Sequence, residues 1–362
     1  MKAWVLHNIN DLRLETIDDP VLKDDEVLVA VKAAGICGSD IPRVFYTGTY
    51  SYPLVPGHEF SGVVAAVGKE VSPEWEGQRV GIFPLIPCDS CGPCRNKQYE
   101  MCRKYSYLGS RRDGGFAEYV AVPVWNLIKL PDNVDYAEAA MMEPMSVAVH
   151  AMRKIAPSES ERIAICGLGT IGLFLLMFLI ESGRKNILAI GNKEFQKRAA
   201  MRLGLPEECY CDSRSQNVDE WLMEKTNDAG ADVFFECVGK NETIKQAVRL
   251  TGAAGRIMLV GNPASDMALE KEVYWKILRN QLTMMGTWNS SYTHDSEDDW
   301  HYVLERLESH RIKPAELITH RFPLEELNRG LDIMRDKKED YGKVMGIINY
   351  TIENAWDKLN NW

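Results

Sequence analysis

RIAICGLGTIG, residues 162–172, is the most informative stretch of this chain: a short apolar run that passes directly into a Gly-x-Gly-x-x-Gly turn. The apolar segment from Ile171 to Ile180 follows at once and predicts a buried helix, because it is shorter than the roughly 20 residues that cross a membrane. Glycines at these positions permit a tight turn and let the backbone approach a pyrophosphate over the positive end of the helix. The alternative is a glycine cluster that packs a helix and binds nothing. We predict a dinucleotide site at Gly167, Gly169, Thr170, Ile171 and Gly172.

The same half of the chain repeats this alternation of strand and helix. From about Ser158, short apolar strands (RIAICG, NILAIGN, DVFFECVG and RIMLVGN) alternate with helical stretches. This pattern is typical of a parallel sheet with crossover helices. Val238, Val260 and Gly261 lie at the ends of two of these strands and are further candidates for contact with the cofactor.

The second strand leaves the choice of dinucleotide open. NAD-binding folds usually place Asp or Glu at its end, where the acid binds the ribose hydroxyls, but here the strand ends at Gly191-Asn192-Lys193. Asn192 can still hydrogen-bond a ribose. Lys193, Lys197 and Arg198 either attract a 2′-phosphate or form an ordinary solvated helix face. We expect NAD or NADP, with NAD slightly favoured.

The first part of the chain, from Met1 to about Trp125, predicts a β-rich domain of short strands and turns. It contains a Cys-x2-Cys-x2-Cys-x7-Cys run formed by Cys88, Cys91, Cys94 and Cys102. Four thiolates at this spacing suit a closed, tetrahedral structural zinc site. The alternative is a disulfide knot or a set of unrelated core cysteines.

A second group of potential metal ligands is spread over three motifs. These are Cys37 in GICGSD, His58 and Glu59 in PGHEF, and Glu143 in MEPMSVAVH. Taken singly, a histidine is more often a core or surface residue, and Glu143 could simply cap a helix. Taken together, one thiolate, one imidazole and one or two carboxylates suit a catalytic zinc that keeps an open coordination position.

Composition excludes several classes of protein. The chain has 362 residues, of which 45% are hydrophobic and 26% charged, as in a soluble globular protein large enough for two domains. Its first residues contain no continuous apolar core or cleavage site, so we expect a cytoplasmic protein that is neither exported nor membrane-spanning. The net charge of −10 argues against nucleic acid as a partner and requires local cations to receive an anionic substrate.

Together with the glycine turn and the four-cysteine loop, these motifs make the chain resemble the zinc-dependent medium-chain dehydrogenase/reductase family over essentially its whole length. The resemblance implies an α/β protein with a GroES-like β-rich catalytic domain and a Rossmann domain built on a doubly wound parallel sheet. It implies that Cys37, His58 and Glu143 hold the catalytic zinc. Glu59 then either ligates the zinc, directly or through water, or orients the site. Ser39 stands at the position of the family's proton-relay hydroxyl, or is a turn serine.

The reaction that the family carries out is hydride transfer between an alcohol and a nicotinamide, with zinc as the Lewis acid. The stretch YLGSRRDGGFAEY, residues 107–119, resembles the polyol-phosphate dehydrogenases of the family. It places Arg111 beside Arg112, and Arg43 follows Cys37 closely, so these cations are candidates to bind a phosphate. The alternative is that they pair with carboxylates or approach the cofactor.

We therefore expect a small-molecule substrate, a polyol or sugar phosphate of the galactitol 1-phosphate to tagatose 6-phosphate type. The resemblance also implies Trp288 and Asn289 as substrate neighbours, although such a tryptophan commonly fills a core. Two alternatives stay open. One is an unphosphorylated polyol, diol or sugar acid as the substrate, and the other is a non-catalytic dinucleotide-binding sensor or structural relative.

We expect residues 1–150 to form the catalytic domain and residues 151–288 the dinucleotide-binding domain, with residues 289–362 returning to the first. The segment LTMMGTW, residues 282–288, is expected to pair subunits into a homodimer or homotetramer. The C-terminal segment TIENAWDKLNNW, residues 351–362, is either a docking segment or a frayed end.

Overall fold

The computed structural model describes residues 1–263 and 265–348, and these residues form two compact units. Unit 1 comprises residues 1–143 and 291–348, and unit 2 is Pro144–Ser290. The boundary expected at residue 150 lies inside helix α4 (Met142–Ile155), and the division falls instead in the first turn of that helix. Helix α4 begins before the change of unit and ends after it, so the change of unit does not coincide with the change of sequence pattern. The segment 351–362 lies outside the described residues.

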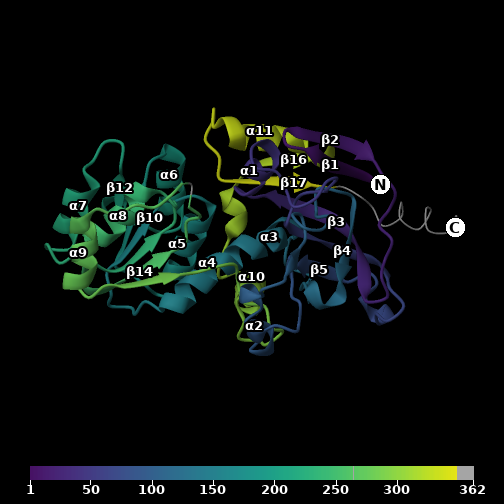
Figure 1. Ribbon diagram of the computed structural model, residues 1–362, viewed down its shortest axis with the longest axis horizontal. Helices are drawn as coiled ribbons and strands as arrows, with labels where there is room; N and C mark the ends of the chain where they lie inside the picture. Colours follow the sequence, from purple (N-terminus) through teal and green to yellow (C-terminus); the bar gives the residue numbers. More distant parts are fainter. Residues whose placement is uncertain (264, 349–362) are drawn as a thin grey trace. The chain divides into compact units, whose positions relative to one another are not determined.

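Unit 2 is built on a sheet whose described strands are all parallel, in the order β12-β11-β10-β13-β14-β15. Figure 1 labels β10, β12 and β14 of this sheet. The strands are β10 (Ile163–Cys166), β11 (Ile187–Gly191), β12 (Tyr210–Asp212), β13 (Ala231–Glu236), β14 (Thr251–Leu259) and β15 (Thr283–Gly286). The first strand of the unit lies inside the sheet, and the chain winds outward from it in both directions. This confirms the predicted doubly wound parallel sheet.

Helices cover both faces of this sheet. They are α5 (Thr170–Glu181), α6 (Glu194–Arg202), α7 (Val218–Lys225), α8 (Asn241–Leu250) and α9 (Lys271–Arg279). Helix α5 contacts α6, whereas α8 contacts both α7 and α9. Right-handed crossovers on either side of β10 place these two groups on opposite faces. The residues of α5 from Leu173 to Leu179 are all buried, as expected for a helix that is apolar on every side.

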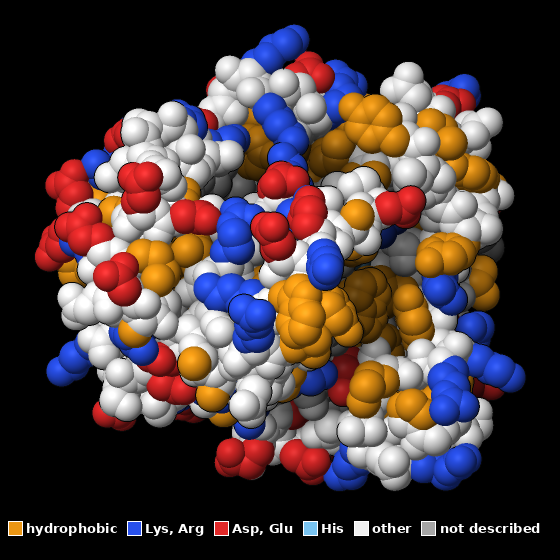
Figure 2. Space-filling view, turned by 60° about the vertical axis from the view of Figure 1, so that its left-hand side comes forward, with side chains coloured by type: hydrophobic (Ala, Val, Ile, Leu, Met, Phe, Trp, Pro, Cys, Tyr) orange, Lys and Arg blue, Asp and Glu red, His pale blue; other side chains and the backbone are white. Residues whose placement is uncertain are grey.

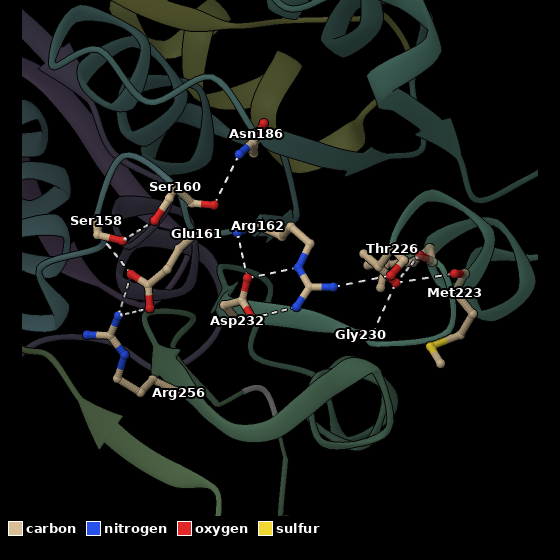
Figure 3. A network of polar contacts seen from close by, with 11 residues as sticks. Ser158, Ser160, Glu161, Arg162, Asn186, Met223, Thr226, Gly230, Asp232 and Arg256 are labelled. Carbon is tan, nitrogen blue, oxygen red and sulfur yellow. Dashed lines mark hydrogen bonds and ion pairs between the residues drawn. The ribbon is translucent and has the colours of Figure 1, made fainter.

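The amino ends of the central strands are joined by a network of ion pairs and hydrogen bonds (Figure 3). Arg162, just before β10, binds both carboxylate oxygens of Asp232 in β13, at 2.8 and 2.7 Å. Arg256 in β14 binds both oxygens of Glu161, at 2.6 and 2.7 Å. The network therefore aligns β10, β13 and β14 at the edge opposite to the glycine turn.

Unit 1 contains a sheet in the order β16-β17-β3-β4-β5-β9, with β8 also paired to β3, among the described residues. The strands are β3 (Glu26–Ile36), β4 (Glu59–Val67), β5 (Arg79–Ile82), β8 (Tyr119–Pro123), β9 (Leu127–Lys129), β16 (Ile318–Pro323) and β17 (Lys343–Ile347). The long strand β3 pairs antiparallel with β8 near its beginning, with β17 near its end and with β4 along most of its length. It is buried almost throughout and forms the centre of the unit's hydrophobic core.

Smaller elements complete unit 1. Two antiparallel pairs lie outside the main sheet: β1 (Lys2–Asn8) with β2 (Asp11–Thr16), and β6 (Leu85–Ile86) with β7 (Ser106–Tyr107). The helices are α1 (Asp40–Phe45), α2 (Gly92–Arg95), α3 (Tyr136–Ala140), α10 (Asp299–Glu308) and α11 (Leu327–Asp336). No helix within the described ranges has the length and apolar character needed to traverse a bilayer.

Candidate active site and metal centres

The four predicted structural ligands converge in the loop between β6 and β7. The sulfur of Cys94 lies 3.4 Å from that of Cys91 and 4.0 Å from that of Cys88, and the sulfurs of Cys91 and Cys102 are 4.0 Å apart. A tetrahedral zinc with Zn–S bonds of about 2.3 Å places its sulfurs about 3.8 Å apart. The loop therefore fits a zinc ion.

The pKa values of two of these thiols diverge. A hydrogen bond from Ser90 lowers the pKa of Cys88 to about 5, whereas burial raises the pKa of Cys94 to about 12. The four groups therefore do not all ionise near neutral pH by themselves. A metal ion would keep all four as thiolates.

A second cluster brings together Cys37, His58 and Glu59, whose ligand atoms lie within 4.8 Å of one another. Cys37 directly follows β3, and His58 and Glu59 stand at the start of β4. Because the two strands are antiparallel, with Gly35 opposite Glu59, the end of β3 meets the beginning of β4. Sheet register thus assembles this cluster from two motifs that lie apart in sequence.

Two buried charged residues, Asp40 and Lys343, contact the residues of this cluster. The buried Asp40 accepts a hydrogen bond of 2.9 Å from the backbone N–H of Cys37, binds the guanidinium of Arg43, and lies 3.5 Å from Nδ1 of His58. The ammonium of Lys343 binds Glu59 and donates to the carbonyl of Ile36 at 3.0 Å. Both Lys343 and Glu59 are almost fully buried, so the pair holds one carboxylate oxygen of Glu59 in place.

The donor atoms of this cluster fit zinc. Burial alone would lower the pKa of His58, but the interactions with Asp40 and Cys37 raise it well above its usual value. Thiolate, imidazole and carboxylate are the donors that zinc binds.

Glu143 lies outside the cluster, although the resemblance implied it as a ligand. It lies in the first turn of α4, is buried, and accepts a hydrogen bond of 3.0 Å from the hydroxyl of Tyr107. Burial raises its pKa to about 7. Of the two acids that the sequence left as alternatives, Glu59 is the one placed with Cys37 and His58. Ser39 is half-buried before the first turn of α1, and its side chain does not cap that helix.

The three predicted phosphate-binding arginines differ in their surroundings. Arg43 is engaged by Asp40, and Arg112 binds the buried Glu26 at 2.5 Å, which is the pairing with carboxylates that the sequence left open as the alternative. Arg111 has no carboxylate partner among the described residues. Its guanidinium lies over the rings of Tyr50 and Tyr105, at 4.2 and 4.4 Å from their centroids, and its buried Nε has no hydrogen-bond partner.

The glycine turn of unit 2 has the shape that a pyrophosphate requires. Gly167 follows β10 with a φ of 95°, and a Cβ there would lie 2.5 Å from Val238. A Cβ on Gly172 would lie 2.0 Å from the carbonyl oxygen of Gly167. A Cβ on Gly169 would meet nothing within 4 Å, so the open space lies at the start of α5, where Thr170 and Ile171 form the first turn. These residues fit a dinucleotide.

Other predicted cofactor residues lie at the same edge of the sheet. Val238 follows β13, and Val260 and Gly261 follow β14. Asn192 and Lys193 connect β11 to α6, and the backbone N–H of Asn192 donates to Gln196 at 2.9 Å. Lys197 binds Glu207 at 2.6 Å, and Arg198 lies 3.9 Å from Glu194. Trp288 and Asn289 follow β15, where Trp288 is 56% exposed and so does not fill a core.

Sequence reasoning missed four residues that organise these sites: Asp40, Tyr107, Glu236 and Lys343. Three of them stand inside stretches already singled out, GSD, YLGSRR and DVFFECVG. The buried carboxylate of Glu236 accepts hydrogen bonds from the backbone of Val238 and Gly239 and so shapes the loop after β13. Lys343 lies 284 residues from Glu59, and no local pattern marks it.

Comparison with known families matches two models to this chain. Residues 23–132 match the alcohol dehydrogenase GroES-like domain, and residues 170–309 match the zinc-binding dehydrogenase domain. Among characterised proteins, galactitol 1-phosphate 5-dehydrogenase of Escherichia coli is 32% identical over 91% of this chain and 95% of its own length. L-idonate 5-dehydrogenase of Vitis vinifera is 34% identical over 89% and 87% of the two chains. Sorbitol dehydrogenase of Bacillus subtilis is 30% identical over 95% and 96%.

Solved structures share the fold over nearly the whole chain. The crystal structure of galactitol-1-phosphate dehydrogenase from Escherichia coli has a TM-score of 0.89 at 32% identity and covers 96% of this chain and 100% of its own. A zinc-binding dehydrogenase of Sinorhizobium meliloti bound to NADP has a TM-score of 0.87 at 26% identity, covering 96% and 98%. An alcohol dehydrogenase of Escherichia coli complexed with NADH has a TM-score of 0.86 at 28% identity, covering 96% and 99%.

Proposed function

Since this chain belongs to the zinc-dependent medium-chain dehydrogenase/reductase family, we propose that it transfers a hydride between a secondary alcohol of a polyol phosphate and a nicotinamide cofactor. The observation that carries the oxidoreductase activity is the cluster of Cys37, His58 and Glu59, a donor set suited to a catalytic zinc. The glycine turn after β10 supplies the dinucleotide site. A non-catalytic sensor would not need to retain these ligands.

Each residue of the candidate site has a separate role in the proposed reaction. Cys37, His58 and Glu59 would hold the zinc, which as a Lewis acid lowers the pKa of an alcohol that it polarises. Ser39 receives the hydroxyl proton and passes it outward. The alcohol carbon gives its hydride to C4 of the nicotinamide, so the alcohol becomes a ketone as the cofactor is reduced. Asp40 and Lys343 keep His58 and Glu59 oriented throughout.

Arg111 supports a phosphorylated substrate. It is a partly buried cation without a carboxylate partner in the described part of the chain, whereas Arg43 and Arg112 are each neutralised by an acid. Contacts lead from it to the zinc ligands, because Tyr105 packs on Tyr107 and Tyr107 packs on His58. Acidic and basic side chains are interspersed over the face drawn in Figure 2, and the net charge is negative, so a phosphate must be received by such a local cation.

A second candidate substrate is an unphosphorylated polyol or sugar acid. The engagement of Arg43 and Arg112 with acids favours it, because only one of the three predicted arginines is left to receive a phosphate. Relatives named as sorbitol and L-idonate dehydrogenases are as similar to this chain as the polyol-phosphate enzyme.

For the cofactor we propose NAD. Lys197 and Arg198, the cations that could bind a 2′-phosphate, lie beside Glu207 and Glu194, so their charge is partly compensated. Asn192 stands where its amide can bond the ribose hydroxyls.

For the assembly we propose a homodimer joined through β15, with a homotetramer as the alternative. This strand lies at the edge of the sheet, and Tyr274, Trp275 and Leu278 of the preceding helix are exposed. A second copy that pairs with β15 would satisfy its open edge. Light scattering coupled to size-exclusion chromatography measures the mass of the assembly directly. A monomer would contradict the proposal.

The experiment that tests the substrate compares tagatose 6-phosphate with tagatose, each with NADH and with NADPH, using zinc-loaded protein. We expect turnover of the phosphate with NADH. Arg111→Met should lower kcat/KM for the phosphate about 10- to 100-fold, as expected for the loss of a charge-assisted hydrogen bond, and leave tagatose almost unchanged. Arg103→Met, an exposed arginine of the same unit, is the matched control. Turnover of tagatose alone would support the unphosphorylated substrate.

A further inference from the structure

We infer that Tyr107 is a positioning residue of the candidate zinc centre, and that its hydroxyl holds the carboxylate of Glu143 outside the set of metal ligands. The inference rests on the proposed function. The hydroxyl of Tyr107 donates to Oε1 of Glu143 at 3.0 Å. The ring of Tyr107 meets the ring of His58 edge-on, with centroids 5.8 Å apart. Tyr107 thus contacts both an expected zinc ligand and the acid that lies beyond the ligand cluster.

The buried position of Glu143 explains why a hydrogen bond that restrains its carboxylate matters. It is buried, only 7% exposed, close to the charges of His58, Glu59 and Lys343. A buried carboxylate beside a divalent cation is attracted into its coordination sphere, which would fill the position that the substrate needs. A phenol that donates to one of its oxygens offers the carboxylate a competing partner. Glu143 then remains an acceptor for a hydroxyl of the substrate.

The position of Tyr107 follows from the four-cysteine loop. Tyr107 lies in β7, opposite Leu85 of β6, and these two short strands enclose the loop from Cys88 to Cys102. Bringing the four sulfurs together closes the loop and keeps β6 and β7 paired. The carbonyl of Tyr107 also accepts hydrogen bonds from the N–H groups of Arg111 and Arg112. The structural metal site is thereby connected to the candidate active site through one side chain.

The test removes the hydroxyl and keeps the ring. In Tyr107→Phe the ring contact with His58 can persist, while Glu143 loses its donor. Tyr99→Phe is the matched control, since Tyr99 lies within the four-cysteine loop and its ring packs on Trp125. Thermal unfolding of each variant verifies that the fold is intact.

Two readouts are measured on protein in which cobalt(II) replaces zinc. If Glu143 enters the coordination sphere, it replaces the solvent ligand at the open position, and this exchange of ligands shifts the visible absorption bands of cobalt. We expect this shift in Tyr107→Phe and an unchanged spectrum in Tyr99→Phe. We also expect Tyr107→Phe to lower kcat about 10-fold, a typical loss for an outer-shell partner, with KM changed less. An unchanged spectrum together with unchanged kcat would overturn the inference.

A double-mutant cycle with Glu143→Gln provides the second test. If Tyr107 acts through Glu143, adding Tyr107→Phe to Glu143→Gln should lower kcat by less than about 2-fold further. Independent, multiplicative effects would contradict the inference. The cobalt spectrum separates this result from failure of the proposed function: a protein that binds cobalt through Cys37 but oxidises no alcohol refutes the function, while the spectra still decide the role of Tyr107.

Discussion

Replacing Cys94 with serine should destabilise unit 1 by removing one of the two buried ligands of the four-cysteine site. Its sulfur lies within 4.0 Å of two other sulfurs, and its side chain is only 5% exposed. A serine hydroxyl is a poor zinc ligand, and three remaining thiolates would hold the ion weakly. The loop between β6 and β7 would then lose its crosslink.

The size of the effect follows from the length of that loop. A crosslink that closes a loop of about 15 residues, such as residues 88–102, is worth about 3 kcal/mol of chain entropy at 25 °C. For a unit of roughly 200 residues, each kcal/mol lowers the melting temperature by about 2–4 °C. Cys94→Ser is therefore expected to lower Tm by roughly 6–12 °C.

The assay combines thermal unfolding with elemental analysis of zinc. We expect the zinc content to fall from two ions per chain to one, and the Tm loss to disappear when both proteins are stripped of metal by a chelator. Cys209→Ser is the matched control, because Cys209 is a partly exposed thiol of unit 2 outside both clusters. Unchanged Tm and unchanged zinc content in Cys94→Ser would refute a structural zinc in this loop.

Further predictions concern the other sites. Cys37→Ser should abolish turnover and remove one zinc per chain while the protein stays folded; a loss of folding would make this residue structural instead. Arg112→Ala should lower the free energy of unfolding by about 1–3 kcal/mol, because it leaves the buried carboxylate of Glu26 unpaired, and should not change the preference for a phosphorylated substrate. Although burial raises the pKa of Glu26, Arg112 lowers it below its usual value, so this ion pair stabilises the protein above about pH 4.3. Urea unfolding should show the difference between wild type and Arg112→Ala shrinking as the pH falls through the lowered pKa of Glu26, and a constant difference would count against the pair. Gly169→Ala should weaken the binding of NADH, measured by NADH fluorescence, with little loss of stability. Gly172→Ala should instead lower Tm, because its Cβ meets the backbone. Equal effects of the two variants on binding and on Tm would contradict these different roles for the two glycines.

The candidate metal and dinucleotide sites differ in how well the sequence predicts them. The four cysteines of the structural site lie within one loop, so their spacing alone predicts that they converge. The glycine turn is likewise a local motif between one strand and one helix, and the doubly wound sheet that it predicts is confirmed. For the catalytic centre, the motifs supplied the candidates but not the choice between Glu59 and Glu143. That choice depends on the pairing of β3 with β4, which places Glu59 beside Cys37.

The three candidate phosphate-binding arginines also show what the sequence alone could not predict. Three cations near the Asp113-Gly-Gly-Phe stretch and Cys37 looked equivalent in sequence, yet Arg43 and Arg112 are bound by acids and Arg111 lies between two tyrosine rings. A side chain of this length reaches partners on several strands. Whether the charge of an arginine can bind a phosphate therefore depends on whether the sheet places a carboxylate next to it.

The sequence by itself determined the family, the two kinds of unit, the four-cysteine loop and the glycine turn, because each of these depends on residues joined by a short length of chain. Only the tertiary structure decided which acid lies beside Cys37 and His58, that Arg111 has no carboxylate partner in the described part of the chain, and that Lys343 binds Glu59 and Tyr107 donates to Glu143. These relations join residues on different strands and helices. They depend on sheet register and on the requirement that each buried charge find a partner, which no local pattern of residues encodes.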